Sequence, residues 1–579
     1  MSKKNKYIIF CSGLLLSLAM FSGCLKQKLD QNWAGPYRDA VWPAIKFVSQ
    51  FPSPVQGGEG DMVTFKIAGL DSLINIWSTD PSLITFQFNG VNAVIDTIRV
   101  ADSIIRAIVP PNASSGSATL KIRNNTYFGP VFRVIGSLSI DSTFNRTGDL
   151  DEFGNVVLGG TSGAIRELRF TNVNNRQSLF LLGAFSQWND SSSVDAPGGD
   201  RNYLSNIIEI NPVNGALRND FVKLGGPNGF LNGMLSLTAF PGYLIYGSFS
   251  RYNWNGSWDG PNNMTRIYRD GSLDYLVKEV YNPDPNSIRN IDTIPVFRGG
   301  TNAAPVKVFI DDRGRLISVG NFTSHHFNLI DDATFSNIPY RATYVPQVMA
   351  QDQLGNIDSS YGYIGITPGQ RPFQGNINDA IQILGQGSPY GKIIIAGTFP
   401  DGLIMLDRDG KPDPSFQGKT NGRVTKITYN ATTRKILIAG AFTQVNGMPA
   451  PAGLAMLNED GSLTSTFNLG AITAATDIRG QVVTYAGQLS NGNIIVSGNF
   501  ASYTQPDGSA PITRRGFMIL NSSGYLAPLL NTTGLFRGQI NDIFEYQMGT
   551  AQPKLVIAGA ISVFDNVEVK NIVRLNMYR

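Results

Sequence analysis

The chain has 579 residues, of which 42% are hydrophobic and 16% are charged, and this balance excludes a largely disordered protein. The formal net charge is +4 and the first segment alone carries Lys3, Lys4 and Lys6, so composition gives no electrostatic case for nucleic-acid binding. The two cysteines, Cys11 and Cys24, are both near the start, which excludes a disulfide framework and a cysteine nucleophile from the rest of the chain.

Residues 1–24 have the three parts of a secretion signal: a basic start, an apolar run from Tyr7 to Met20, and small residues before Cys24. The ending Phe21-Ser-Gly-Cys24 resembles the lipobox of bacterial lipoproteins, with Phe where Leu is usual. The resemblance implies that Cys24 is acylated, becomes the mature N-terminus and anchors the protein to a membrane. An ordinary signal peptide with a chance cysteine is the alternative.

Residues 25–42 show no sustained hydrophobic period and are expected to form a tether. In residues 43–136, short alternating runs are separated by Gly, Pro, Asn and Asp turns, which predicts a β-sandwich. The predicted strands are Val63–Ile67, Ile84–Phe88, Ile104–Val109 and Ala118–Ile122. Four features resemble the immunoglobulin-like IPT/TIG domain: Gly58-Glu-Gly60 before VTFKIAGL, Phe88-Asn-Gly-Val91, Ile108-Val-Pro-Pro111, and Ser115-Gly116 before the next strand. The resemblance implies a spacer or docking module without chemistry.

From residue 137 to 579 the chain repeats one pattern, in which an apolar β-prone run ends in Gly, one small or polar residue, and Phe. The copies are Gly183-Ala-Phe185, Gly247-Ser-Phe249, Gly320-Asn-Phe322, Gly397-Thr-Phe399, Gly440-Ala-Phe442 and Gly498-Asn-Phe500, with Gly559-Ala-Ile561 as a degenerate copy. Successive glycines are 64, 73, 77, 43, 58 and 61 residues apart. A strand-based repeat of this length predicts an all-β fold with a β-propeller.

Each repeat can be read as four strands, with a tight turn between the third and the fourth. The turns are Asp270-Gly271, Asp409-Gly410 and Asp460-Gly461, with Asn214-Gly215, Leu354-Gly355 and Ser523-Gly524 as variants. Asp413-Pro-Ser-Phe416 and related sequences follow these turns. The combination of hydrophobic-Gly-x-Phe, Asp-Gly and Asp-x-Ser-Phe resembles the bacterial delta-sixty β-propeller repeat, most strongly between residues 392 and 530.

The two ends of the repeat region predict how the propeller closes. The last repeat reaches Arg579 without a fourth strand, whereas Asp141-Ser-Thr-Phe144 occurs alone before the first repeat. We therefore expect a strand near residues 141–144 to pair with the C-terminal blade and close the ring. Seven blades is the expected count, and six or eight stay open because the two longest spacings could hold an extra strand pair.

Most insertions fall in the loops after Gly-x-Phe and between blades, which open on one face of a four-stranded propeller. These loops mix aromatic rings with Asn, Asp and Ser, a composition that suits the faces of sugars or an extended peptide. The candidate ligand-binding residues are Trp188, Tyr203, Tyr252, Trp254, Trp258, His325, His326 and Tyr503. The alternative is that the rings only cap the ends of the blades.

The sequence contains no constellation that would indicate an enzyme. His325 and His326 are the only histidines and are adjacent, but no HExxH or comparable spacing supports a metal site. Acidic residues in the loops could supply the two carboxylates of a glycosidase, yet the Ser-x-Asp-x-Gly repeat of sialidase propellers is absent. We therefore expect no catalytic residues, no metal and no cofactor.

The leader, the lipobox, the IPT/TIG-like segment and the propeller together resemble Bacteroidetes outer-membrane lipoproteins encoded beside SusC/SusD-like importers. The resemblance implies a lipid-anchored, cell-surface protein that captures a glycan or peptide and passes it to the transporter. A docking protein of an envelope complex and a propeller hydrolase are the other hypotheses. A concave aromatic face would favour capture, a flat apolar face docking, and paired carboxylates hydrolysis.

If Cys24 carries the lipid, replacing Cys24 with Ser should turn a protein that needs detergent for extraction into one that mild washing releases. The reason is that each buried methylene of an acyl chain contributes about 0.8 kcal/mol of membrane affinity. Membrane fractionation followed by immunoblotting measures this, and Cys11→Ser is the matched control that should leave extraction unchanged. A Cys24→Ser protein that still needs detergent would contradict lipidation at this residue.

Overall fold

The computed structural model describes residues 45–150, 156–195, 201–221, 225–252, 262–286, 291–335, 337–363, 366–384, 391–476, 480–547 and 552–578. The leader, Cys24 and the expected tether lie outside the described residues. Strands dominate the described chain, which confirms the all-β prediction apart from one α-helix and short 3-10 turns. None of the described helices is long and apolar enough to cross a bilayer.

Residues 45–135, called the N-terminal domain below, have their own core. The strands are β1 (Lys46–Phe47), β2 (Gln56–Gly57), β3 (Met62–Ala68), β4 (Ile84–Phe88), β5 (Val91–Arg99), β6 (Ile104–Ile108), β7 (Gly116–Ile122) and β8 (Asn125–Val134), paired in the order β1-β3-β6-β5-β4-β7-β8-β2. Phe65, Phe86, Phe88 and Phe132 pack at the centre, with successive ring centroids 4.8, 5.6 and 5.1 Å apart. Successive side chains of a strand point to opposite faces, so in strands such as β3 every second side chain enters the core.

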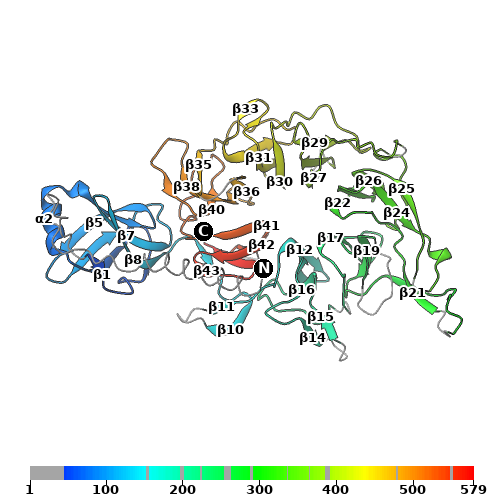
Figure 1. The fold of residues 1–579 in the computed structure, drawn as a ribbon, viewed down its shortest axis with the longest axis horizontal. Coiled ribbons are helices and arrows are strands. Elements are labelled where there is room, and N and C mark those ends of the chain that lie inside the picture. Colours follow the sequence, from blue (N-terminus) through cyan, green and yellow to red (C-terminus); the bar gives the residue numbers. More distant parts are fainter. Residues whose placement is uncertain are drawn as a thin grey trace, which may run out of the picture.

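The helix α2 (Asp71–Thr79) was not predicted from the sequence. Leu70 and Leu73 are buried in the domain core, and Ile76 and Trp77 pack against it. The spacing of three to four residues between them is the spacing of one helical face, but the segment is too short for that period to stand out. Figure 1 shows α2 at the end of the domain farthest from the propeller.

Residues 137–578 form a β-propeller. Each blade is one sheet, and the strands of each are given from the inner strand outwards. The first blade has β12 (Ile165–Val173), β13 (Arg176–Gly183) and β16 (Ile207–Ile210); the second β17 (Leu231–Ser236), β18 (Gly242–Gly247) and β19 (Met264–Tyr268); the third β22 (Pro305–Ile310), β23 (Leu316–Gly320) and β26 (Val348–Gln351); and the fourth β27 (Ile377–Gln382), β28 (Ile393–Gly397) and β29 (Leu403–Leu406). The fifth has β30 (Arg423–Asn430), β31 (Lys435–Ala441) and β34 (Leu454–Asn458); the sixth β36 (Val483–Gln488), β37 (Ile494–Gly498) and β40 (Phe517–Leu520); and the last β41 (Arg537–Tyr546), β42 (Lys554–Phe564), β44 (Ile572–Met577) and β9 (Leu138–Ile140). The inner strands contact one another in the closed cycle β12-β17-β22-β27-β30-β36-β41-β12 and surround a common centre (Figure 1).

The glycine of each Gly-x-Phe copy lies against the inner strand of its own blade. At Gly440 an added Cβ would be 2.2 Å from the carbonyl oxygen of Arg423 and 2.9 Å from the Cα of Val424, so no side chain fits there. Phe442 is buried in the core that this blade shares with the preceding one. The repeated pattern therefore marks a close approach of two strands followed by an aromatic core residue.

The Asp-Gly turns and their variants have the positive φ angles that the sequence predicts. Gly410 has φ 77°, and Gly271, Gly355 and Gly461 have φ angles of 87°, 97° and 84°. A Cβ at Gly410 would also lie 2.5 Å from the ring of Tyr361, the aromatic residue of the preceding blade's Asp-x-Ser-Tyr sequence. These positions therefore need glycine both for the backbone angle and for packing against the neighbouring blade.

The fourth strand of the blades is shorter than predicted. After the turn, Leu406 and Pro412 form a single bridge before the chain leaves the sheet. Asp413 Oδ1 accepts hydrogen bonds from the N–H and the hydroxyl of Ser415, at 2.9 and 2.7 Å, and this local turn competes with the sheet ladder. Phe416 then packs against the core between this blade and the next.

The ring closes through β9, which pairs antiparallel with β44 of the last blade. This strand lies directly before the predicted 141–144 region, and Asp141–Phe144 forms the turn that follows it. Asp141 Oδ2 lies 2.8 Å from Nη2 of Arg574 and 3.0 Å from Nζ of Lys554, and both Asp141 and Arg574 are buried. The last blade and the N-terminal strand are thus joined by an ion pair shielded from water.

Arg574 also joins the last blade to the first. Its Nη1 donates to the carbonyl oxygens of Pro212 and Val213, both at 2.7 Å. Its guanidinium carbon lies 4.5 Å from the ring centroid of Phe144, which packs in the core between these two blades. We call the place where the ring closes the seam. At the seam, the single buried side chain of Arg574 joins the last blade to the first blade and to the Asp141–Phe144 turn.

A group of charged residues occupies equivalent positions on the inner strands, each after a register shift. They are Glu167, Lys307, Asp379, Lys426 and Asp542. The three carboxylates accept hydrogen bonds from backbone N–H groups of the next inner strand, at Met234, Ile427 and Leu168. Burial raises the pKa of Asp542, and the charges of Lys307 and Lys426 oppose this rise. The carboxylates that follow these register shifts thus link one blade to the next around the centre of the propeller.

The N-terminal domain packs directly on the propeller. The N–H and hydroxyl of Ser115 donate to the carbonyl of Thr532, at 2.8 and 3.0 Å. Arg514, which is buried, donates to the carbonyl of Asn112 at 3.1 Å, and burial lowers the pKa of Arg514 to about 9. These contacts fix the domain against the last two blades.

Replacing Asp141 with Asn should lower the free energy of unfolding by about 2–4 kcal/mol at neutral pH, because Arg574 stays buried without its counter-ion. Burial alone would raise the pKa of Asp141, but hydrogen bonds from Thr143 and Lys554 and the charge of Arg574 lower it from 3.8 to about 2. The carboxylate therefore stabilises the fold above about pH 4, and this contribution is lost as the pH falls from about 4 to 2. Denaturant titrations at neutral and acidic pH will measure both effects.

Asp190→Asn is the matched control, because Asp190 pairs with Lys570 at 2.6 Å while 75% of its side chain is exposed. The expected loss is below about 0.5 kcal/mol. Equal losses in the two variants would contradict a special role for the seam.

Candidate functional site

Two of the predicted aromatic residues, Tyr252 and Tyr503, are buried in the propeller. Their hydroxyls donate hydrogen bonds to the carbonyls of the turn glycines Gly271 and Gly524. Burial raises the pKa of both, to about 12 for Tyr503. Each ring therefore ties a loop to a turn of the same blade, and in this conformation neither offers a ring face to a ligand.

His325 is also closed to solvent. It lies in β24 (Ser324–Asn328), which forms a hairpin with β25 (Tyr340–Tyr344), and it is completely buried. Its Nε2–H donates to the carbonyl of Gly355 at 3.1 Å. Burial lowers the pKa of His325 to about 4, so the ring is neutral at pH 7. In this structure His325 supports the blade and does not face a ligand.

His326 lies in a groove between the second and third blades, called the rim groove below. The groove has a volume of about 360 Å³ and is lined by Asn228, Ser248, Phe249, Ser250, Asn262, Asn263, Thr301, Asn302 and His326. The His326 ring stacks on Tyr340 with centroids 4.3 Å apart and an angle of 19° between the ring planes. Tyr340 is 51% exposed. The groove therefore combines hydroxyl and amide groups with the His326 ring, on which the half-exposed Tyr340 ring stacks.

The amide groups of the rim groove are held in place by the loops around it. Asn302 Oδ1 accepts from the N–H groups of Thr323 and Ser324, at 2.8 and 3.1 Å, and its Nδ2 donates to the Thr323 hydroxyl. Asn228 is held in the same way: its Oδ1 accepts from the N–H groups of Ser250 and Arg251, and its Nδ2 donates to the Ser250 hydroxyl. Because these bonds fix the side chains before any ligand arrives, the polar wall is preorganised.

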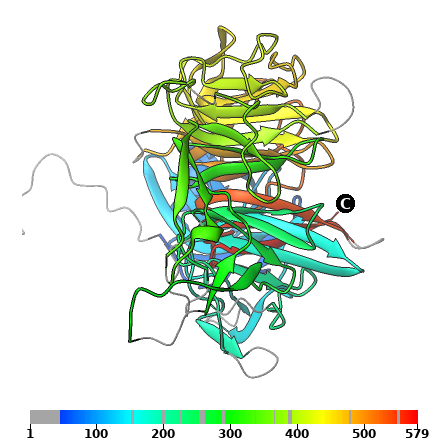
Figure 2. The same cartoon turned by 90° about the vertical axis from the view of Figure 1, so that its right-hand side faces the viewer.

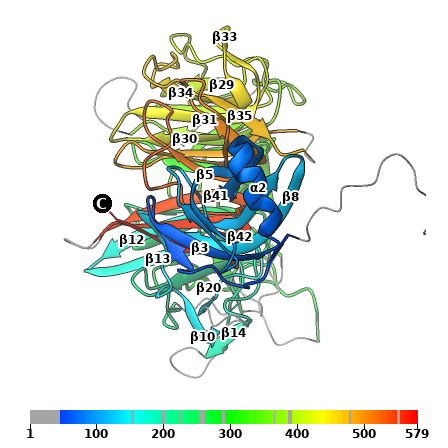
Figure 3. The ribbon, with the colours of Figure 1, turned by 90° about the vertical axis from the view of Figure 1, so that its left-hand side faces the viewer.

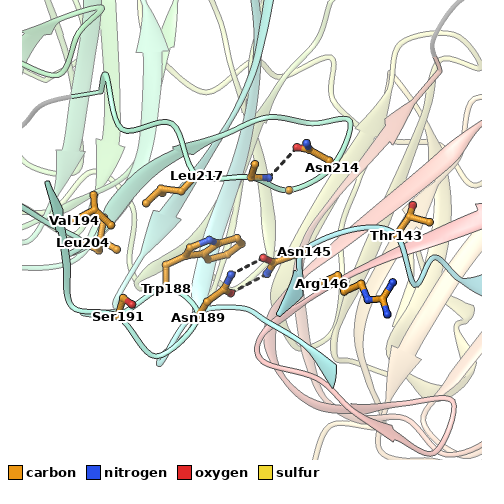
Figure 4. Close-up of a pocket in the computed structure, with 12 residues that line it drawn as sticks. Thr143, Asn145, Arg146, Trp188, Asn189, Ser191, Val194, Leu204, Asn214 and Leu217 are labelled. Carbon is orange, nitrogen blue, oxygen red and sulfur yellow. Dashed lines mark hydrogen bonds between the residues drawn. The ribbon is translucent and has the colours of Figure 1, made fainter. Parts of the chain in front are cut away.

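A larger cavity, of about 470 Å³, lies where the closing turn meets the first blade, and we call it the seam pocket (Figure 4). Trp188 and Asn189 reach it from the loop after β13, Asn145 from the turn after β9, and Arg146 from the start of β10 (Arg146–Leu150). Asn145 and Asn189 exchange two amide hydrogen bonds, at 3.1 and 2.8 Å. Trp188 is almost fully buried, so it forms a wall of the pocket and not an open platform.

The eight candidate residues are not brought into one site. Trp188 and His326 line different cavities. Tyr203 ends β15 (Arg201–Tyr203), which pairs with β14 (Ser193–Asp195), and it is partly exposed there. Trp254 and Trp258 lie outside the described residues, so their role in binding stays a prediction.

The described lining of the rim groove can stack and form hydrogen bonds, but it includes no carboxylate. Within the ranges that the structure covers, no three His, Cys, Asp or Glu side chains gather closely enough to hold a metal ion.

The candidate list missed Tyr340. Asn328 pairs with Tyr340 across the hairpin, which places His326 and Tyr340 diagonally on the same face, where aromatic side chains can meet. The alternating sequences SHHFN and YRATY carry this signal, but only once the two segments are recognised as partners.

No protein-family model and no curated protein matches the chain. Among solved structures, a structural-genomics protein of unknown function from Bacteroides thetaiotaomicron is 11% identical, with a TM-score of 0.25 over 80% of this chain and 96% of the other. The WD40 β-propeller domain of Doa1 is 11% identical, with a TM-score of 0.31 over 72% of this chain and 93% of that domain. The propeller assignment rests on the cyclic contacts of the inner strands.

His325 predicts a loss of stability in mild acid. The folded protein holds His325 neutral with a pKa of about 4, whereas the unfolded chain protonates it near pH 6.5, so stability falls by about 3 kcal/mol as the pH drops from 6.5 to 4. The only other imidazole in the chain is His326, whose pKa burial also lowers, so the two single variants separate the two contributions. Denaturant titrations across this range should show a flatter profile for His325→Gln than for the wild type or for His326→Gln, and an unchanged slope would contradict the assignment.

Proposed function

We propose that this chain is a non-catalytic lipoprotein of the bacterial outer membrane that captures a glycan or peptide for a SusC/SusD-like importer. The proposal includes acylation of Cys24, display at the cell surface, an N-terminal domain of the IPT/TIG type and a seven-bladed propeller of the delta-sixty type. The sheet order of the propeller and the separate core of the N-terminal domain support the last two parts.

The stacked pair of His326 and Tyr340 beside the rim groove is the observation that carries the capture proposal. A sugar ring presents an apolar face and a rim of hydroxyl groups, and a peptide presents side chains and a polar backbone. Tyr340 can stack on the apolar face of a sugar or on a peptide side chain, while the exposed Ser248 and Ser250 of the groove can form hydrogen bonds with sugar hydroxyls or a peptide backbone. The preorganised amides reduce the entropy lost on binding.

The expected affinity is modest. Stacking on an aromatic ring contributes roughly 0.5–1.5 kcal/mol beyond the area that it buries, and a shallow groove with few rings is expected to bind in the micromolar to millimolar range. Weak binding suits a protein that must hand its cargo to a transporter.

A second candidate function is docking to an envelope partner through a projecting hairpin. β20 (Tyr275–Glu279) and β21 (Ile291–Pro295) leave the ring between the second and third blades and carry exposed Tyr275, Val277 and Ile291, with Tyr281 just beyond β20. A small separate core around Ile294 and Ile330 supports this hairpin. It lies at the edge of the propeller farthest from the N-terminal domain, nearest the viewer in Figure 2. An exposed apolar surface on a rigid base is typical of a protein interface.

Calorimetry of the chain against glycan and peptide libraries tests capture. Tyr340→Ala should weaken binding by about three- to tenfold, because it removes one stacking ring from an exposed position. Tyr281→Ala is the matched control, an exposed tyrosine on the projecting hairpin that should leave ligand affinity unchanged.

The same experiment separates the sites. A ligand whose affinity is unchanged by Tyr340→Ala but lost in Arg146→Ala would place binding in the seam pocket. A loss of affinity in Trp254→Ala and Trp258→Ala would extend the rim groove, because these two residues precede its Asn262 and Asn263 in the sequence. Absence of any ligand, with loss of a partner's binding in Tyr281→Ala, would favour docking.

A further inference from the structure

One edge of the N-terminal domain carries large apolar side chains that no part of the described chain covers. Val48, Phe51, Val55, Phe128 and Val131 are each more than half exposed, from 54% for Val48 to 76% for Phe128. We call these five residues the apolar strip.

The pairing of the strands brings the strip together. Val48 directly follows β1, which contacts β8, and a Cβ on Gly129 of β8 would lie 2.6 Å from the Phe47 ring. Val55 directly precedes β2, and its carbonyl accepts a hydrogen bond from the N–H of Arg133 in β8 at 3.3 Å. The strip therefore follows the edge made by β1, β2 and β8.

A bulge in β8 explains why two of these residues point outwards. Thr119 pairs with Phe128 and Ser117 with Val131, so β8 has one more residue than β7 in this interval. The extra residue shifts the alternation, so that Phe128 and Val131 both face solvent while Phe132 and Val134 enter the core. The strip is thus built by the backbone and does not result from a loose core.

The chain enters the domain beside the strip. The described residues begin at Ile45, and Val48 lies three residues later. Residues 25–44 lead back to Cys24, and a chain of that length can separate the two by at most about 70 Å even when fully extended. A lipid on Cys24 would therefore keep this edge of the molecule within about 70 Å of a bilayer.

Three charged side chains around the strip have the sign that an anionic lipid surface attracts, while Glu59 and Asp61 beside β2 carry the opposite charge. Lys46 of β1, Lys66 of β3 and Arg133 of β8 are all exposed on the strands that carry or flank it. Basic side chains next to exposed Phe and Val are the combination with which peripheral proteins meet the interface of a membrane. Figure 3, which looks at the molecule from the side of the N-terminal domain, shows β3 and β8 in that domain.

We propose that the apolar strip docks on the phospholipid surface next to the lipid anchor, and so sets the orientation of the propeller relative to the membrane. The proposal rests on the lipid anchor of the proposed function, but the contact itself needs no acyl chain. With Phe51 and Phe128 in the interface, the propeller projects from the membrane at a fixed angle, because the N-terminal domain is bonded to the last two blades.

The test is co-sedimentation of the mature chain carrying Cys24→Ser with vesicles of phosphatidylethanolamine and a minority of phosphatidylglycerol. The wild-type surface should bind, and the double variant Phe51→Ser/Phe128→Ser should bind about tenfold more weakly. Val277→Ser/Tyr281→Ser, which removes exposed apolar side chains from the projecting hairpin, is the matched control and should bind like the wild type. Thermal melts will show that the variants stay folded.

No vesicle binding, or equal loss in both double variants, would overturn the proposal. Hydrogen exchange without vesicles adds a second criterion: protection of residues 25–44 that is lost in Phe51→Ser/Phe128→Ser would mean that the chain's own segment covers the strip, which would also overturn it. Self-association that the same variant abolishes would point to a second copy and would have the same effect. Acylation of Cys24 and ligand capture are measured separately, so their failure is distinguishable from failure of the strip.

Discussion

The propeller depends on one close approach, repeated in blade after blade. The glycine that ends the second strand lies so near the inner strand that a Cβ on Gly183, Gly247 or Gly498 would be 2.0–2.1 Å from a carbonyl oxygen. A register shift follows at this point of the inner strand, and backbone N–H groups near it are bonded by side chains of the neighbouring blade. The same glycine thus permits the packing within a blade and the linkage between blades.

Much of the fold could be predicted because these constraints act on single residue types. Only glycine tolerates both the approach at Gly440 and the turn at Gly410, so the two positions stand out in the sequence. The fourth strand could not be predicted in the same way. Its length is decided by competition between the ladder and the turn at Asp413, and the sequence does not show which of the two hydrogen-bond patterns is more stable.

The site was harder to predict than the fold. Tyr252, Tyr340 and Tyr503 all lie in or beside polar loops and are similar in the sequence, yet two are buried and one is half exposed. The difference is whether a turn carbonyl lies within reach of the hydroxyl, as Gly271 and Gly524 do for Tyr252 and Tyr503. That distance is set by residues about 20 positions away and has no local signal. His325 and His326 differ for a related reason, since adjacent residues in a strand face opposite sides.

The seam has a consequence for how the protein is made. Ile140 is synthesised early, but its partner Leu575 comes from the last blade, more than 400 residues later. Until the last blade has been synthesised, β9 has no partner and the first blade has no neighbour on one side. Folding of the ring therefore cannot finish before the last blade has been made, and the unfinished chain exposes strand edges until then. The nearly complete propeller thus keeps an open edge until the last strand has been made.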